Sequence, residues 1–124
     1  MRQMRAMLFL AGAVLLAASS AHAQDAAAGE KVFKSQCSIC HATAAGKNLL
    51  GPSMAGVVGR KAGTVPGFHY TDANKNSGLT WDEATLDRYL AGPRAVVPGT
   101  TMAYSGVKAE QQRKDLIAYL ATLR

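Results

Sequence analysis

The sequence predicts an all-α fold with about three main helices, short helical turns and long loops. Three observations support this prediction. Apolar residues recur at helical spacing in an early, a middle and a final segment, whereas no segment alternates apolar and polar residues as a half-buried strand does. Between the early and middle segments, residues 42–79 are punctuated by glycine and proline and follow neither period.

The first helix is predicted to begin after Asp25, a residue type that caps helix N-termini, and to run to about Gln36. Val32, Phe33 and Cys37 then share one apolar stripe. In the loop that follows, the segment "TDANKN" predicts one short helical turn, with Thr71 as its N-cap.

The middle helix is predicted in "TWDEATLDRYLAGP". Thr80 followed by Glu83 has the pattern of a capping box, Gly78 stops the preceding turn, and the closing Gly-Pro pair ends the helix. One face of this helix is expected to carry Trp81, Leu86, Tyr89 and Leu90. "VVPGTTMAYSG" predicts another loop, and a last helix is expected from about Ala109, with its stripe at Leu116, Ile117, Leu120 and Leu123.

The first 23 residues have the pattern of a cleaved secretory signal peptide. Arg2 and Arg5 precede an apolar run, and "AHA" forms a small-residue cleavage site ending at Ala23. The run is shorter than the ~20 apolar residues that a spanning helix needs, so we expect no stable membrane insertion. Residues 24–124 are then expected to form a single domain in the periplasm.

Charge and composition exclude one class of partner. The chain carries a net charge of +6, but its lysines and arginines are spread out and form no run that tracks a phosphate backbone. We therefore expect no nucleic-acid binding. A long irregular loop inside a compact domain is unusual, and it is expected where the loop encloses a bound group that replaces protein core.

The segment "CSICH" contains the only two cysteines of the chain, Cys37 and Cys40, followed by His41. On a continuing helix the two sulfurs face the same side, about 5–6 Å apart. This spacing matches two neighbouring vinyl groups of a haem, with the histidine directed toward the iron. C-x-x-C-H is the signature of c-type haem attachment.

Three other interpretations of the cysteine pair explain the sequence less well. A thioredoxin-like dithiol belongs to a βαβ pattern, which the chain lacks. A structural zinc site needs four ligands, and beyond the signal peptide the only further histidine is His69. A structural disulfide leaves the adjacent histidine unexplained. For the sixth position of a haem iron, Met102 in "PGTTM" is favoured over Met54, which lies on the histidine side, and His69 remains the alternative.

The chain resembles the class I c-type cytochromes, a family that includes mitochondrial cytochrome c and small soluble bacterial relatives. The resemblance covers about residues 29–123. It rests on "GEKVF", "CSICH", "GPSMAGVVGRKAG", "PGFHYTDANKNSGLTW", "PGTTM" and "DLIAYL". It implies the cytochrome c fold, in which helices and long loops wrap around one covalent haem c.

The resemblance also implies how the haem is held. Cys37 and Cys40 would form the two thioether bonds, while His41 and Met102 would be the axial metal ligands. The carbonyl of Pro52 would accept a hydrogen bond from the His41 ring.

Other roles follow from the same resemblance. Arg60, Tyr70 and Trp81 would surround the inner haem propionate, and Thr71 and Thr100 the outer one. Such donors are expected because a partly buried carboxylate needs hydrogen bonds.

Two further positions complete the implied site. Tyr89 would belong to a polar cluster near the Met102 sulfur, and Gly29 would let the first and last helices approach closely near Leu116.

The chain departs from the family at the lysine-rich haem edge. Charged residues remain at three of the rim positions, and uncharged residues occupy others. The charged ones are Lys31, Arg94 and Lys108, and the uncharged ones are Gln36, Ala95 and Thr101.

The resemblance implies a soluble periplasmic one-electron carrier and not an enzyme. Its partners would be redox complexes of a respiratory or photosynthetic chain: an oxidase, a quinol-cytochrome c reductase, a reaction centre or a dehydrogenase. We expect a monomer. Two rival hypotheses are a haem peroxidase or gas-binding protein, which needs an open sixth position, and a haem-free disulfide protein.

Overall fold

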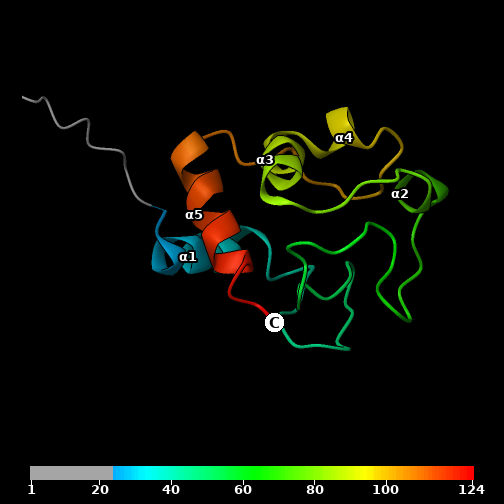
Figure 1. The fold of residues 1–124 in the computed structure, drawn as a ribbon, viewed down its shortest axis with the longest axis horizontal. Helices are drawn as coiled ribbons and strands as arrows, with labels where there is room; N and C mark the ends of the chain where they lie inside the picture. Colours follow the sequence, from blue (N-terminus) through cyan, green and yellow to red (C-terminus); the bar gives the residue numbers. More distant parts are fainter. Residues whose placement is uncertain (1–23) are drawn as a thin grey trace, which may run out of the picture.

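The computed structural model describes residues 24–124, so the predicted signal peptide lies outside the described residues. In chain order the helices are α1 (Ala26–Gln36), α2 (Asp72–Lys75), α3 (Glu83–Ala91), α4 (Pro93–Val96) and α5 (Glu110–Leu120) (Figure 1). Within residues 24–124 there is no strand, and one isolated antiparallel bridge joins Lys61 to Thr80. The all-α prediction is confirmed. No helix in this range is long and apolar enough to cross a membrane.

The main helix–helix contact joins α1 and α5, which lie at opposite ends of the described chain (Figure 1). A Cβ atom added at Gly29 would lie 1.9 Å from the main-chain oxygen of Asp115, so only glycine permits this approach. The Asp115 side chain accepts the N–H of Asp25 at 2.9 Å, and Leu116 beside it is completely buried. The close approach expected at Gly29 is therefore present.

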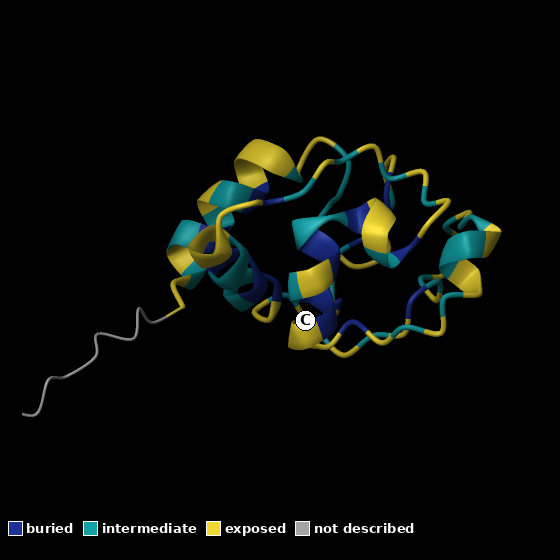
Figure 2. Ribbon diagram, turned by 90° about the horizontal axis from the view of Figure 1, so that it is seen from above, coloured by how far each residue is buried: buried dark blue, intermediate teal, exposed yellow. Residues whose placement is uncertain are grey.

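The core forms where α1, α3 and α5 turn their apolar faces inward. In Figure 2 the buried residues gather on inner helix faces and the exposed ones on outer turns and loops. Each predicted apolar face contributes to this core. Its buried hydrophobic residues are Phe33, Val57, Ala62, Trp81, Leu86, Tyr89, Leu90, Val97, Val107, Leu116, Ile117 and Leu120.

The start of α3 differs from the prediction. The N-cap is Asp82, whose carboxylate accepts the N–H of Thr85 at 2.7 Å, and not Thr80. This hydrogen bond lowers the pKa of the Asp82 carboxyl. Thr80 lies two residues earlier, where it pairs with Lys61 in the isolated bridge. The prediction of a capping box formed by Thr80 and Glu83 was therefore wrong, because pairing with a distant loop holds Thr80 outside the helix.

The other helix ends follow the sequence more closely. Asp25 caps α1 by accepting the N–H of Ala28 at 3.1 Å, and Thr71 caps α2, as predicted. The turn of α2 ends at Lys75, before Gly78. The Gly-Pro pair ends α3, but Pro93 also starts α4, a short helix that the sequence did not predict.

The long loop is fastened to the segment before α3 by main-chain hydrogen bonds. The N–H of Gly59 donates to the carbonyl of Trp81 and the N–H of Trp81 to that of Arg60, both at 2.8 Å. The N–H of Ala62 donates to Leu79 at 2.9 Å. These bonds place Arg60 beside Trp81.

Candidate functional site

The two cysteines lie on a turn that continues α1. The N–H of Cys37 donates to the carbonyl of Phe33 at 2.8 Å, and the N–H groups of Cys40 and His41 both donate to the carbonyl of Cys37. Both thiols are free and half-buried. Burial, reinforced by the nearby Cys40, raises the pKa of the Cys37 thiol to about 11. A dithiol that exchanges with other thiols needs the opposite shift.

His41 is held in one orientation by its neighbours. Its Nδ1 lies 2.8 Å from the carbonyl oxygen of Pro52, which can only accept, so Nδ1 carries the proton. A Cβ atom added at Gly51 would lie 2.2 to 2.8 Å from atoms of the imidazole ring, so the ring packs directly on the main chain. Burial lowers the pKa of the His41 ring, which leaves Nε2 with a free lone pair, the state in which histidine binds metals.

Met102 lies in the segment between α4 and α5, with its sulfur turned toward α3. The hydroxyl of Tyr89 donates to the Met102 Sδ at 3.2 Å, and the Met102 N–H donates to the Thr100 hydroxyl at 3.2 Å. Burial raises the pKa of the Tyr89 hydroxyl, so it keeps the proton that it donates. The thioether is thereby fixed by a group on a neighbouring helix.

The two other candidate ligands occupy different surroundings. The N–H of Met54 donates to the carbonyl of Ala42 at 2.9 Å, next to His41 in the chain. The main chain of Met54 therefore lies beside the residue that follows His41. The side chain of His69 is exposed.

Arg60 is a half-buried cation whose hydrogen bonds are incomplete. Its Nη1 donates to the carbonyls of Ser53 and Ala55, both at 3.0 Å, while its buried Nε has no partner among the described residues. Burial lowers the pKa of the guanidinium. A buried donor without a partner is costly, so an anionic acceptor such as a haem carboxylate fits beside Arg60.

The other residues assigned to the propionates divide into two groups. Trp81 is buried, bonded to Arg60 through its main chain, and its ring packs on that of Tyr89 with centroids 4.7 Å apart. The Tyr70 hydroxyl accepts the N–H of Val65 at 3.1 Å, which leaves its own proton free to donate.

The two threonines assigned to the outer propionate support main-chain turns. The Thr71 hydroxyl accepts the N–H of Asn74 at 3.3 Å, and the Thr100 hydroxyl accepts that of Met102. A Cβ atom added at Gly99 would lie 3.3 Å from Cβ of Ala73, so the segment before Met102 lies against α2. Each hydroxyl retains a proton for a further acceptor.

Sequence reasoning missed two residues that support this site. Ser53 is buried; its hydroxyl donates to the Ala44 carbonyl at 2.7 Å, and its own carbonyl accepts from Arg60. Gly51 is the second; the sequence shows it only as one of the glycines of the loop between residues 42 and 79, and in the structure the His41 ring packs against its main chain. Their position around Pro52, which faces the histidine ring, was the available signal.

The donor set suits a haem better than a metal ion bound by protein alone. In residues 24–124, no group of three or more His, Cys, Asp or Glu side chains could hold a metal ion. Two thiols on one turn, a neutral imidazole, a half-buried thioether and a guanidinium whose buried Nε has no acceptor among the described residues match the attachment, axial and carboxylate groups of haem c. Fold and site together define a c-type haem protein.

Comparison with known proteins agrees with this class. The family model for cytochrome c matches residues 26–124, and the chain belongs to the cytochrome c family. Cytochrome c2 of Rhodomicrobium vannielii is 56% identical over 115 residues, which cover 91% of each chain. Cytochrome c2 of Blastochloris viridis is 52% identical over 120 residues, 94% of this chain and 92% of that protein.

A solved structure is similar as well. Cytochrome cH from Methylobacterium extorquens is 49% identical with a TM-score of 0.74, and the match covers 79% of this chain and 98% of that one. The chain therefore has the cytochrome c fold and binds one covalent haem c through the cysteine pair of its C-x-x-C-H motif. It is an electron-transfer protein and not an enzyme.

Proposed function

We propose that residues 24–124 form a single-domain periplasmic one-electron carrier whose haem iron is ligated by His41 and Met102. The observation that carries this proposal is the pair of fixed ligands. The ring of His41 is oriented by Pro52, and the sulfur of Met102 is oriented by Tyr89. Both donors are neutral and preformed, so neither has to lose a proton to bind iron.

When bound, haem c supplies an iron that gains or loses one electron. His41 and Met102 would occupy both axial positions, which leaves none for a substrate and raises the potential of the iron. Because hydrogen bonds hold both side chains, little rearrangement would accompany a change of charge. Arg60 and Tyr70 would donate to a haem carboxylate, which keeps that buried charge from being uncompensated.

The proposed partners are redox complexes that give and take single electrons, namely an oxidase, a quinol-cytochrome c reductase, a reaction centre or a dehydrogenase. Residues 1–23 would direct export and would then be removed by cleavage after Ala23. A mature protein whose mass retains residues 1–23 would contradict the export part of the proposal.

The ligation is tested with Met102→Ala, using Met54→Ala as the matched control. In the oxidised haem-loaded protein, the far-red band of iron–sulfur ligation should disappear in Met102→Ala and persist in Met54→Ala. The Met102 variant should also bind carbon monoxide when reduced and have a lower potential. Ready binding of carbon monoxide by the unchanged reduced protein would instead support a gas-binding protein or peroxidase, and the electron-carrier proposal would be dropped.

A further inference from the structure

The residues around Met102 form an irregular segment between α4 and α5 that begins and ends at a glycine. Gly99 and Gly106 have φ angles of +88° and +110°, a region that glycine adopts far more readily than other residues. Positions of this kind at the ends of a loop can absorb the main-chain rotation of a hinge. We call residues 99–106 the Met102 segment.

The two ends of the Met102 segment are fastened to neighbouring groups. At the first end, the N–H of Thr100 donates to the carbonyl of Val97 at 3.1 Å. At the second end, the ammonium of Lys108 donates to the carbonyl of Ser105 at 2.7 Å. Both bonds lie outside residues 102–104, so the middle of the segment depends on other contacts.

A groove borders the middle of the Met102 segment. It has a volume of about 490 Å³ and is lined by residues 92–95, which include the start of α4, and by residues 103–105. The start of α4 therefore gives the middle of the segment little packing support.

One side chain joins the middle of the Met102 segment to α1. The hydroxyl of Tyr104 donates to Oε1 of Gln36, the last residue of α1. The N–H of Tyr104 donates to the carbonyl of Met102 at 2.9 Å. This second bond couples the position of the tyrosine to that of the methionine.

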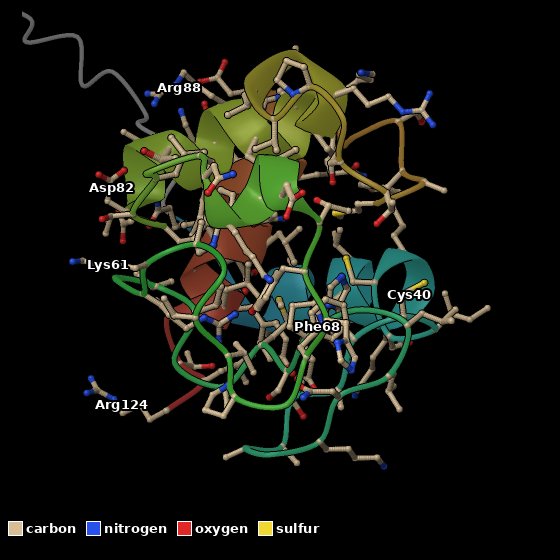
Figure 3. All side chains as sticks on the ribbon, turned by 90° about the vertical axis from the view of Figure 1, so that its right-hand side faces the viewer. Cys40, Lys61, Phe68, Asp82, Arg88 and Arg124 are labelled. Carbon is tan, nitrogen blue, oxygen red and sulfur yellow. The ribbon has the colours of Figure 1, made fainter. Side chains whose placement is uncertain are left out.

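The Tyr104–Gln36 bond ends beside the attachment turn. Gln36 directly precedes Cys37, whose carbonyl accepts the N–H of Cys40 at 3.1 Å. Figure 3 shows Cys40 on the opposite side of the molecule from Lys61. The bond therefore links the segment that carries the proposed sixth ligand to the turn that carries the cysteines.

The chemistry of Gln36 suits this contact. The resemblance expects charged side chains along the haem edge, and Gln36 is one of the uncharged exceptions. A glutamine side chain has a carbonyl oxygen that accepts a hydrogen bond, whereas a lysine ammonium only donates. The absence of charge at this position therefore goes together with an acceptor for the Tyr104 hydroxyl.

We propose that Gln36 and Tyr104 are positioning residues for the sixth iron ligand, because the hydrogen bond between them holds the Met102 segment against α1. This inference rests on the proposed ligation by Met102. For the sulfur to leave the iron, the main chain around it has to move, and Tyr104 lies only two residues away. Each local opening of this kind breaks the Tyr104–Gln36 bond, so the bond lowers the fraction of molecules whose sixth position is open.

Imidazole measures that fraction, because this small ligand binds the oxidised iron only after the Met102 sulfur has left. At low imidazole concentration, the second-order rate constant of binding is proportional to the open fraction. Tyr104→Phe and Gln36→Leu should each raise this constant about threefold, the effect of one exposed hydrogen bond. The double variant should also be about threefold faster, and not about ninefold, because both substitutions remove the same bond.

Controls separate this bond from other effects of the substitutions. Gln112→Leu and Tyr119→Phe make the same chemical changes on α5, outside the Met102 segment, and should bind imidazole at the rate of the unchanged protein. Gln36→Glu keeps an oxygen that accepts from Tyr104, so its rate should stay within about twofold of the unchanged protein. The measurement is made at a pH where imidazole is neutral, so the new carboxylate neither attracts nor repels it.

The outcomes distinguish failure of this inference from failure of the proposed ligation. If the oxidised unchanged protein lacks the far-red band of iron–sulfur ligation, ligation by Met102 is wrong and the positioning role falls with it. If the band is present and the Tyr104 and Gln36 variants bind imidazole at the unchanged rate, the positioning role alone is overturned.

Two further results would also overturn the positioning role. Variants that melt at a lower temperature without binding imidazole faster would show that the bond only stabilises the fold. A double variant about ninefold faster than the unchanged protein would show that the two side chains act independently.

Discussion

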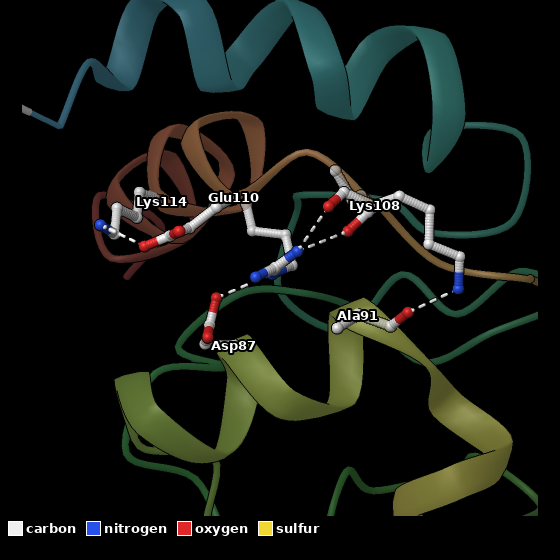
Figure 4. Close-up of polar contacts among 7 residues, drawn as sticks. Asp87, Ala91, Lys108, Glu110 and Lys114 are labelled. Carbon is white, nitrogen blue, oxygen red and sulfur yellow. Dashed lines mark hydrogen bonds and ion pairs between the residues drawn. The ribbon is translucent and has the colours of Figure 1, made fainter. Parts of the chain in front are cut away.

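Lys108 should stabilise the Met102 segment, and replacing it by methionine tests this. Its ammonium donates to the carbonyl of Ala91, the last residue of α3, at 2.8 Å (Figure 4). It also donates to the carbonyl of Ser105 at 2.7 Å. The lysine thereby ties the segment after Met102 to the end of α3. Methionine keeps most of the aliphatic stem and removes both hydrogen bonds.

The expected loss follows from these two contacts. Each exposed hydrogen bond contributes about 0.5–1 kcal/mol net. The cation also lies at the negative end of the α3 dipole, which adds a few tenths of a kcal/mol. The free energy of unfolding should therefore fall by about 1–2 kcal/mol, a factor of about 5–30 in the unfolded fraction. For a domain of this size the melting temperature should fall by about 5–10 °C.

The assay combines thermal unfolding of the haem-loaded protein with amide exchange at Val107, whose N–H donates to Leu90 at 2.8 Å. The control is Lys114→Met, because Lys114 carries the same charge on α5 and pairs with the exposed Glu110 (Figure 4). The Lys108 variant should melt earlier and exchange the Val107 amide faster than the control does. Equal melting temperatures and equal exchange in the two variants would refute the stabilising role.

Two further predictions concern the helices. Gly29→Ala places a Cβ atom 1.9 Å from the Asp115 carbonyl oxygen, so α1 and α5 must separate. The free energy of unfolding, measured in urea, should fall by about 3 kcal/mol or more. The control Ala27→Ser should change it little. Asp82→Ala tests the cap of α3. Because the Asp82 pKa is lowered in the folded state, its stabilisation is present at neutral pH and is lost as the pH falls through the folded pKa. Urea unfolding at a series of pH values should show that the variant is less stable than the parent protein at pH 7 and equally stable in acid. A difference in stability that does not depend on pH would contradict this account.

The sequence predicted the helices where local signals were unambiguous. Asp25 was the plausible cap for α1, and apolar spacing identified the buried faces of α1, α3 and α5. At α3 two cap patterns overlap, Thr80 with Glu83 and Asp82 with Thr85. Local chemistry permits both, and the choice depends on the pairing of Thr80 with Lys61, which is distant in sequence.

The site also combines features that local sequence signals identify with features that depend on contacts between distant residues. The motif with its two cysteines and histidine could be identified from spacing, because covalent attachment fixes the order of these residues. The bracing role of Lys108 could not be predicted from the sequence. A lysine on an exposed rim and a lysine that binds two main-chain carbonyls have the same sequence context. Ser53 was missed for a similar reason, because its importance lies in a carbonyl that accepts from Arg60.

The distribution of burial explains why so much of the site depends on main-chain groups. Between residues 42 and 79 the only buried hydrophobic residues of the core are Val57 and Ala62, whereas most of the core comes from later segments. So long a segment cannot offset its conformational entropy with two small side chains. It is held by main-chain bonds to the segment around Trp81 and by the donors of Arg60, one of which, Nε, has no acceptor among the described residues. A haem would supply both the missing apolar contact area and a carboxylate that can accept from Arg60. Folding of residues 42–79 is therefore expected to be coupled to haem binding.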